Sequence, residues 1–161
     1  HGNSGYETSH AGAGSSRLNL MFASQARVLH DRLLSLAYRL PEVRDLILVD
    51  RNGLTLVSTL GSGSLEETLA AFAGSALAQM DRAKAEFQMG PLYLMHLAGR
   101  DRQVFVTPLT SDVALAAVAD AGASASTVTL HLLAMAREIL ELVHAKTERG
   151  SAGSQDPQAP V

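Results

Sequence analysis

Three long segments of the chain repeat an apolar residue every three or four positions, which is the spacing of an amphipathic helix. They predict helices over about Leu18–Leu40, Ser64–Phe87 and Ser124–Ala145. The second begins with a capping box, because Ser64 is followed three residues later by Glu67. Each of these helices has an apolar side that needs a surface to pack on.

Shorter apolar runs lie between the helices and predict strands. Leu46–Thr59 holds two runs rich in Leu, Ile, Val and Thr on either side of Asp50-Arg51-Asn52-Gly53. Three more strands are predicted over Leu92–Ala98, Gln103–Leu109 and Val113–Ala119. The order helix-strand-strand-helix-strand-strand-strand-helix predicts an α+β fold, with one five-stranded antiparallel sheet and helices on its faces.

The two ends of the chain differ from the middle in composition. Residues 1–16 and 147–161 are rich in Gly, Ser and other small or polar residues. Segments of this kind bury little apolar surface, so we expect flexible tails. Residues 17–146 are then one domain.

Charge and composition exclude several classes of function. The net charge is −3 and Trp is absent, which argues against nucleic-acid binding. No apolar run is long enough to span a bilayer, and no secretory signal is apparent, so we expect no membrane insertion. Because the sequence contains no Cys, disulfide scaffolds and thiol chemistry are excluded, and a cytoplasmic location is expected.

No catalytic or metal-binding motif is found. Asp50-Arg51-Asn52-Gly53 lacks the ligand spacing of a calcium loop, and Asn-Gly is a strong hairpin signal, so a plain turn is predicted. No Ser lies in a GxSxG elbow, and phosphate-binding glycine loops are absent. The histidines at 30, 96, 131 and 144 do not cluster in sequence. We therefore expect no catalytic residue, metal or cofactor, and no enzymatic activity.

The second helix carries a further signal on the side away from its apolar stripe. That stripe, which is predicted to pack on the sheet, comprises Leu65, Leu69, Phe72, Ala76, Met80, Ala83 and Phe87. The opposite side has small residues where charges are usual, including a mid-helix Gly, which costs roughly 1 kcal/mol relative to Ala. Small residues let another helix approach closely. They predict a dimer contact through Ala70, Ala71, Gly74, Ala78 and Asp81; the alternative is an Ala-rich surface helix.

The strand after Gly90-Pro91 carries a second signal for self-association. It has almost no charge, so as an edge strand it would lack the usual protection against pairing with another chain. Pairing with its own copy across a twofold axis would satisfy its backbone. The residues predicted to take part are Leu92, Tyr93, Leu94, Met95 and Leu97.

Together these elements resemble the roadblock family of dynein light chains and their bacterial relatives. The resemblance is carried by VRDLILVDRNGLTLVST (Val43–Thr59), the helix after Ser64, the Gly-Pro strand start, RQVFVTPL (Arg102–Leu109) and VALAAVAD (Val113–Asp120). It covers about Ala26–Val143. No single motif is diagnostic, and the pattern as a whole makes the match.

The resemblance implies a dimer in which the third strands pair and the second helices pack together on one sheet face. It places the first and third helices on the other face. Family members serve as platforms for small Ras-like GTPases, and some bacterial relatives promote GTP hydrolysis without supplying a catalytic side chain. Others are subunits of dynein or of lysosomal scaffolds.

The leading hypothesis is therefore a non-enzymatic, homodimeric regulator or scaffold that binds a small Ras-like GTPase and modulates its nucleotide hydrolysis. Glu67 and Gln79 are candidates for the partner-binding surface. One alternative is a profilin-like module that senses a small ligand, which would need a pocket between helix and sheet. Another is a structural subunit of a larger cytoskeletal or signalling assembly.

Overall fold

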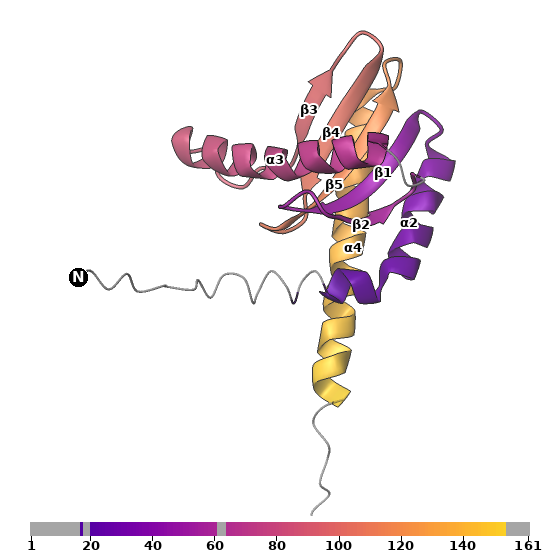
Figure 1. Ribbon diagram of the computed structural model, residues 1–161, viewed down its shortest axis with the longest axis vertical. Coiled ribbons are helices and arrows are strands. Elements are labelled where there is room, and N and C mark those ends of the chain that lie inside the picture. The colour runs from indigo at the N-terminus through magenta and orange to yellow at the C-terminus, as the bar shows by residue number, and fades with distance from the viewer. Residues whose placement is uncertain (1–16, 18–19, 61–63, 154–161) are drawn as a thin grey trace, which may run out of the picture.

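A computed structural model describes Arg17, residues 20–60 and residues 64–153, except for the side chains of Ser64 and of residues 146–153. The helices and strands follow one another along the chain in the predicted order (Figure 1). The elements are α2 (Ala26–Arg39), β1 (Val43–Asp50), β2 (Thr55–Ser58), α3 (Ser64–Glu86), β3 (Met95–Ala98), β4 (Arg102–Pro108), β5 (Val113–Asp120) and α4 (Ala125–Gly153).

The five strands form one antiparallel sheet in the order β2-β1-β5-β4-β3. The central strand β5 pairs with β1 on one side and β4 on the other, and all of its residues from Val113 to Ala119 are buried. The outer strands are β2 and β3, so the strand after Gly90-Pro91 lies at an edge of the sheet.

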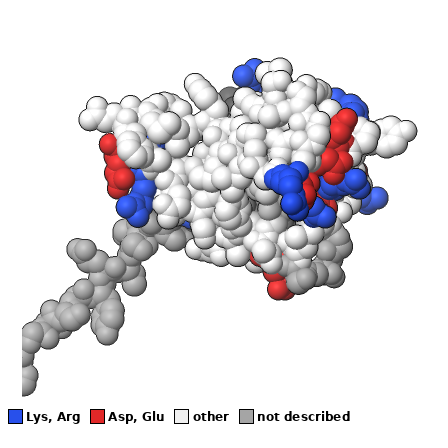
Figure 2. Space-filling view, turned by 90° about the horizontal axis from the view of Figure 1, so that it is seen from above, with Lys and Arg blue, Asp and Glu red and all other residues white. Residues whose placement is uncertain are grey.

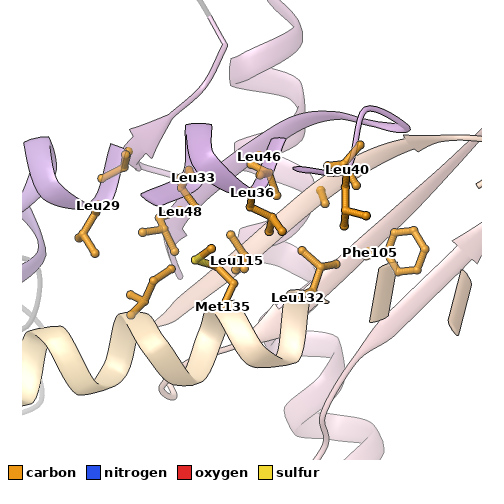
Figure 3. Packing of buried hydrophobic residues seen from close by; sticks show 14 of the residues in the cluster. Leu29, Leu33, Leu36, Leu40, Leu46, Leu48, Phe105, Leu115, Leu132 and Met135 are labelled. Carbon is orange, nitrogen blue, oxygen red and sulfur yellow. The ribbon is translucent and has the colours of Figure 1, made fainter. Parts of the chain in front are cut away.

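α2 and α4 cover one side of the sheet, which we call the two-helix face. Figure 3 shows Leu29, Leu33 and Leu36 of α2 pointing toward Leu132 and Met135 of α4, with side chains of the sheet between them. The labelled leucines of this cluster are almost wholly buried. Long side chains from both helices and the sheet therefore build this layer.

α3 alone covers the opposite side, which we call the one-helix face. Its cluster is smaller and uses shorter side chains, among them Ala70, Ala73 and Ala76 of the helix and Ala114 and Ala116 of β5. One helix on this face and two on the other is the predicted arrangement, so the fold class is confirmed.

Several boundaries differ from the predictions. The first helix is interrupted by a turn at Gln25, so that residues 20–24 and α2 are separate helical segments. β3 starts at Met95, because residues 91–94 return the chain from the end of α3 to the sheet. α4 continues beyond Ala145 to Gly153, into the segment predicted as a tail. Residues 1–16 and 154–161 lie outside the described residues.

Candidate interaction surface

The orientation of α3 on the sheet differs from the predicted one. Leu69, Ala76 and Met80 are buried as expected. Leu65, Phe72 and Phe87 were also predicted to pack on the sheet, and they are 46%, 37% and 72% exposed. The helix is rotated about its axis, so that this part of its apolar stripe faces outward.

The rotation is explained by a close contact between α3 and the β1–β2 hairpin. A Cβ atom built on Gly74 would lie 2.8 Å from the backbone nitrogen of Gly53 and 3.0 Å from the carbonyl oxygen of Arg51. The mid-helix glycine therefore serves packing within one chain. The prediction that Gly74 and Ala70 lie on a free dimer face is wrong, because the fold buries both residues.

The hairpin turn is held together by the side chain of Asp50. One carboxylate oxygen of Asp50 accepts hydrogen bonds from the backbone N–H groups of Asn52 and Leu54, both at 2.9 Å. Gly53 has a φ of 82°, which lets the chain reverse directly beneath α3. The predicted plain turn is confirmed, although only the glycine takes a positive φ.

The remaining predicted helix residues of the dimer contact are exposed. Ala71 and Ala78 are on the outer surface of α3. Asp81 is also exposed, and its carboxylate pairs with Arg51 of the same chain. That guanidinium also donates to the carbonyl oxygen of Ser111, at 2.9 Å. Asp81 thus helps to hold the helix against the hairpin.

The C-terminal end of α3 extends beyond the sheet that it covers. Its 23 residues span about 34 Å, whereas the outer strands of a five-stranded sheet are roughly 19 Å apart. Between Asp81 and Glu86 every side chain is exposed except that of Ala83, which is half-buried. We call residues 82–89 the overhang, and Figure 1 shows this end of α3 lying past β3.

Large apolar side chains are exposed on the overhang and on the segment that follows it. Phe87 is 72% exposed, Met89 56% and Tyr93 71%. Single exposed apolar residues are common, but a contiguous set marks an interaction site. Within the residues that the structure describes, each of these side chains is more than half exposed.

An apolar groove of about 310 Å³ lies on the side of α3 that faces β3. Phe72 and Leu65 form its helix wall, and Leu97, which is 48% exposed, belongs to its strand wall. The complete lining is Leu65, Thr68, Leu69, Phe72, Leu97, Arg102, Val104 and Val118. Arg102 is the charged member of this set.

Nearby, partial burial raises the pKa of Asp45, while Arg102 and Arg44 act in the opposite direction.

The edge strand β3 presents a mixed surface. Tyr93 and Leu97 are exposed, whereas Leu92, Leu94 and Met95 are partly buried against the chain's own clusters or loops. Of the residues predicted to form the strand contact, Tyr93 and Leu97 are therefore accessible to a partner. Leu92, Leu94 and Met95 are only partly accessible.

One exposed side chain of β3 is fixed by a polar network. The ring of His96 stacks on Phe105 with centroids 4.4 Å apart, and its Nε2 lies 2.7 Å from Oε1 of Gln103. The amide nitrogen of Gln103 donates to the carbonyl oxygens of Asp120, Ala121 and Ala123. This network ties the edge strand to the turn between β5 and α4.

Both residues predicted to contact a GTPase are exposed on α3, on different sides of the helix. Gln79 follows Phe72 by seven residues, and two helical turns place it on the groove side. Glu67 precedes Ala71 by four residues and shares its side of the helix.

Charge is unevenly distributed over the surface. Seen from the end of the molecule with the β3–β4 hairpin, a broad uncharged area separates groups of charged side chains near its margins (Figure 2). In the part of the chain that the structure describes, no three His, Asp or Glu residues gather as a metal site would require. None of the described helices combines the length and apolar character needed to cross a membrane.

The sequence predictions missed the groove and the overhang because Leu65, Phe72 and Phe87 were assigned to the core. A signal was present in the length of the apolar stripe. It runs from Leu65 to Phe87, further than one sheet of five strands can cover.

Comparison with known families and structures gives a consistent result. The family model of the Roadblock/LC7 domain matches residues 29–119, which confirms the resemblance inferred from the sequence. This family is generally non-catalytic. No curated protein sequence matches the chain.

Among solved structures, the Roadblock/LC7 domain from Streptomyces avermitilis has a TM-score of 0.63 and 18% identity, over 68% of this chain and 92% of that one. MglB from Myxococcus xanthus has a TM-score of 0.63 and 20% identity, over 75% and 96%. The gliding protein MglB from Thermus thermophilus has a TM-score of 0.60 and 18% identity, over 73% and 92%. At these identities the likeness shows the fold alone.

Proposed function

The chain belongs to the Roadblock/LC7 domain family, and on that premise we propose that it is a homodimeric, non-enzymatic regulator or scaffold that binds a small Ras-like GTPase and modulates its nucleotide hydrolysis. The observation that supports a dimer is the incomplete cover of the one-helix face. α3 leaves a groove open on its own sheet and extends an apolar end past that sheet.

In the proposed twofold dimer, the groove of one copy receives the overhang of the other. In a twofold dimer each copy contributes the same patch, so both features are supplied twice. If two β3 edges pair, the overhang of each copy comes to lie above the sheet of the other. There it meets the groove beside Phe72. The exposed Phe87 and Met89 are apolar anchors of suitable size for that groove.

Edge pairing is supported by the strand itself. β3 is an outer strand of four residues, paired on one side by β4. Its sequence, Met-His-Leu-Ala, has no Lys, Glu or Pro to oppose a second strand. A continuous sheet across two copies would use the free edge.

The dimer is tested by Phe72→Asp, which places a carboxylate in the groove. We expect the dimer dissociation constant to rise at least ten-fold, while circular dichroism shows a folded protein. Leu54→Asp is the matched control, because Leu54 is 60% exposed on the hairpin and outside the groove. Sedimentation velocity that finds Phe72→Asp still dimeric at low micromolar concentration would contradict the proposal.

Gly74, which the sequence pattern placed in the dimer contact, is unsuitable for this test. A larger side chain there would collide with the chain's own hairpin, so loss of the dimer could follow from loss of the fold. Substitutions on the groove side avoid this ambiguity.

The GTPase partner is supported by the family assignment and by the likeness to MglB gliding proteins. We propose that any effect on hydrolysis acts through the GTPase's own residues. We also propose a cytoplasmic location, which the absence of Cys supports.

Binding is tested by calorimetry with purified small Ras-like GTPases from the source organism, loaded with GDP or a non-hydrolysable GTP analogue. We expect affinity to depend on the nucleotide, and Glu67→Lys or Gln79→Ala to weaken it at least five-fold. Glu141→Lys is the control, because Glu141 is an exposed acid on α4. If no GTPase binds in either state while the dimer persists, the structural-subunit alternative is favoured.

A further inference from the structure

A second hollow lies on the other side of α3, where the helix leaves the sheet. It is a cavity of about 340 Å³ bounded by α3, the return segment at Pro91 and the turn between β4 and β5. Its lining shares no residue with the groove. It is therefore a separate site, in the position that a ligand-sensing module would need.

The apolar part of the cavity comes from three elements. Leu77 and Met80 belong to α3 and are nearly buried, and Leu109 lies on the opposite wall after β4. At roughly 30 Å³ for each small group, a volume of about 340 Å³ accommodates on the order of ten non-hydrogen atoms. This is at the lower end of the range of small-molecule sites.

The polar part of the cavity is dominated by hydrogen-bond donors. The Thr110 hydroxyl oxygen accepts from the backbone N–H groups of Asp112 and Val113, at 3.1 and 3.0 Å, which leaves its proton to be donated. Ser111 adds a second hydroxyl to the lining. Both lie in the turn that forms one wall.

The lining contains one acidic and one basic residue, and they differ in their ion pairing. Asp81 and Lys84 both line the cavity, but the Asp81 carboxylate is paired with Arg51. Within the described part of the chain, Lys84 has no ion pair. Its ammonium group is therefore the charge left to meet a ligand.

We propose that this cavity binds a small amphiphilic carboxylate, with its apolar chain against Leu77, Met80 and Leu109. The carboxylate is held by the ammonium group of Lys84 and the hydroxyls of the β4–β5 turn. Such a ligand bridges α3, at the start of the overhang, to the sheet. This inference does not depend on the GTPase partner or on the dimer.

The test uses the full chain and two probes of equal chain length, octanoate and 1-octanol. By isothermal titration calorimetry we expect octanoate to bind at least ten-fold more tightly than the neutral alcohol. Lys84→Gln is expected to abolish this difference, and Lys84→Arg to keep most of it. Arg82→Gln is the matched control, because Arg82 is an exposed cation on the same helix that does not line the cavity.

Three results would overturn the assignment. The first is equal binding of octanoate and octanol, or no binding of octanoate at millimolar concentration. The second is the same loss in Lys84→Gln and Arg82→Gln, which would indicate non-specific attraction to the surface. The third is a loss that follows Phe72→Asp and not Lys84→Gln, which would place the ligand in the groove.

Discussion

The helices of the chain cover the two faces of the sheet to different extents. On the two-helix face, leucines from α2 and α4 interdigitate with the sheet and bury almost completely. On the one-helix face, α3 covers the centre and leaves the groove on one side and the cavity on the other. The same strands form both faces. The difference therefore comes from the side chains that the strands direct to each face and from the number of helices that cover it.

Strand alternation shows how the difference arises. β5 places Leu115 on the two-helix face and Ala114 and Ala116 on the other. Small side chains let α3 lie close to the sheet, but one helix is only about 10–12 Å wide. Because α3 runs across the strands, this width covers only part of their length, which is about 26 Å for the eight residues of β5. A face built this way has room for partners.

Truncation on the two-helix face should have the largest effect on stability. Leu132 is fully buried between α4 and the sheet. Leu132→Ala should lower the free energy of unfolding by about 2–5 kcal/mol, the usual cost of lost burial plus a cavity. Urea denaturation measures this.

The matched control for that substitution is Leu130→Ala, on the same helix. Leu130 is 69% exposed, so its effect should stay within about 0.5 kcal/mol. Because the two-helix face is complete within one chain, the folded Leu132→Ala protein should keep the wild-type dimer constant. A weaker dimer would mean that the two faces are not independent.

On the one-helix face, Gly74→Ala should destabilise the protein although Ala is the better helix former. Helix propensity alone predicts a gain of about 1 kcal/mol. The new Cβ would meet hairpin backbone at 2.8 Å, and we expect a net loss of about 1–3 kcal/mol. Ser75→Ala, at the exposed neighbouring position, should show no such loss. Equal effects of the two variants in thermal unfolding would remove the hairpin contact from the explanation.

A buried hydroxyl group lies among the apolar side chains of the two-helix face. The Thr107 hydroxyl is buried without a hydrogen-bond partner in the described structure. An unsatisfied buried polar group is costly, so Thr107→Val should raise the free energy of unfolding by about 1 kcal/mol. Ser58→Ala, in a strand whose Ser58 hydroxyl is hydrogen-bonded, should not stabilise the protein. A loss of stability in Thr107→Val would show that the hydroxyl has a partner after all.

The smallest effect concerns the partly exposed Asp45. Burial is the main cause that raises its pKa, so folding favours the protonated form. The contribution of Asp45 to stability is then most favourable below its ordinary pKa of 3.8 and declines as pH rises through the raised value. Asp45→Asn should remove this decline and stabilise the protein at neutral pH by a few tenths of a kcal/mol, since the group is largely solvated. Denaturation measured from pH 3 to 7 tests the sign.

Local patterns were sufficient to predict the order of the elements. They were insufficient for the rotation of α3. Leu65 and Phe72 are as apolar as any core residue, and Gly74 resembled a contact for another helix. What decides the rotation is the fit of Gly74 against Gly53, two residues distant in sequence that meet only in the folded chain. The sequence alone does not distinguish an apolar side chain that packs in the core from one that is exposed for contact with a partner.

The network around His96 has a consequence for hydrogen-bond chemistry at the sheet edge. Because the amide nitrogen of Gln103 is surrounded by three carbonyl oxygens, its amide oxygen must face the imidazole. Nε2 of His96 must then carry the proton and donate it. As long as the ring is neutral, Nδ1 is left as an acceptor. A second chain that pairs with β3 at this position therefore contacts one fixed tautomer of His96. Gln103 on β4 determines that tautomer.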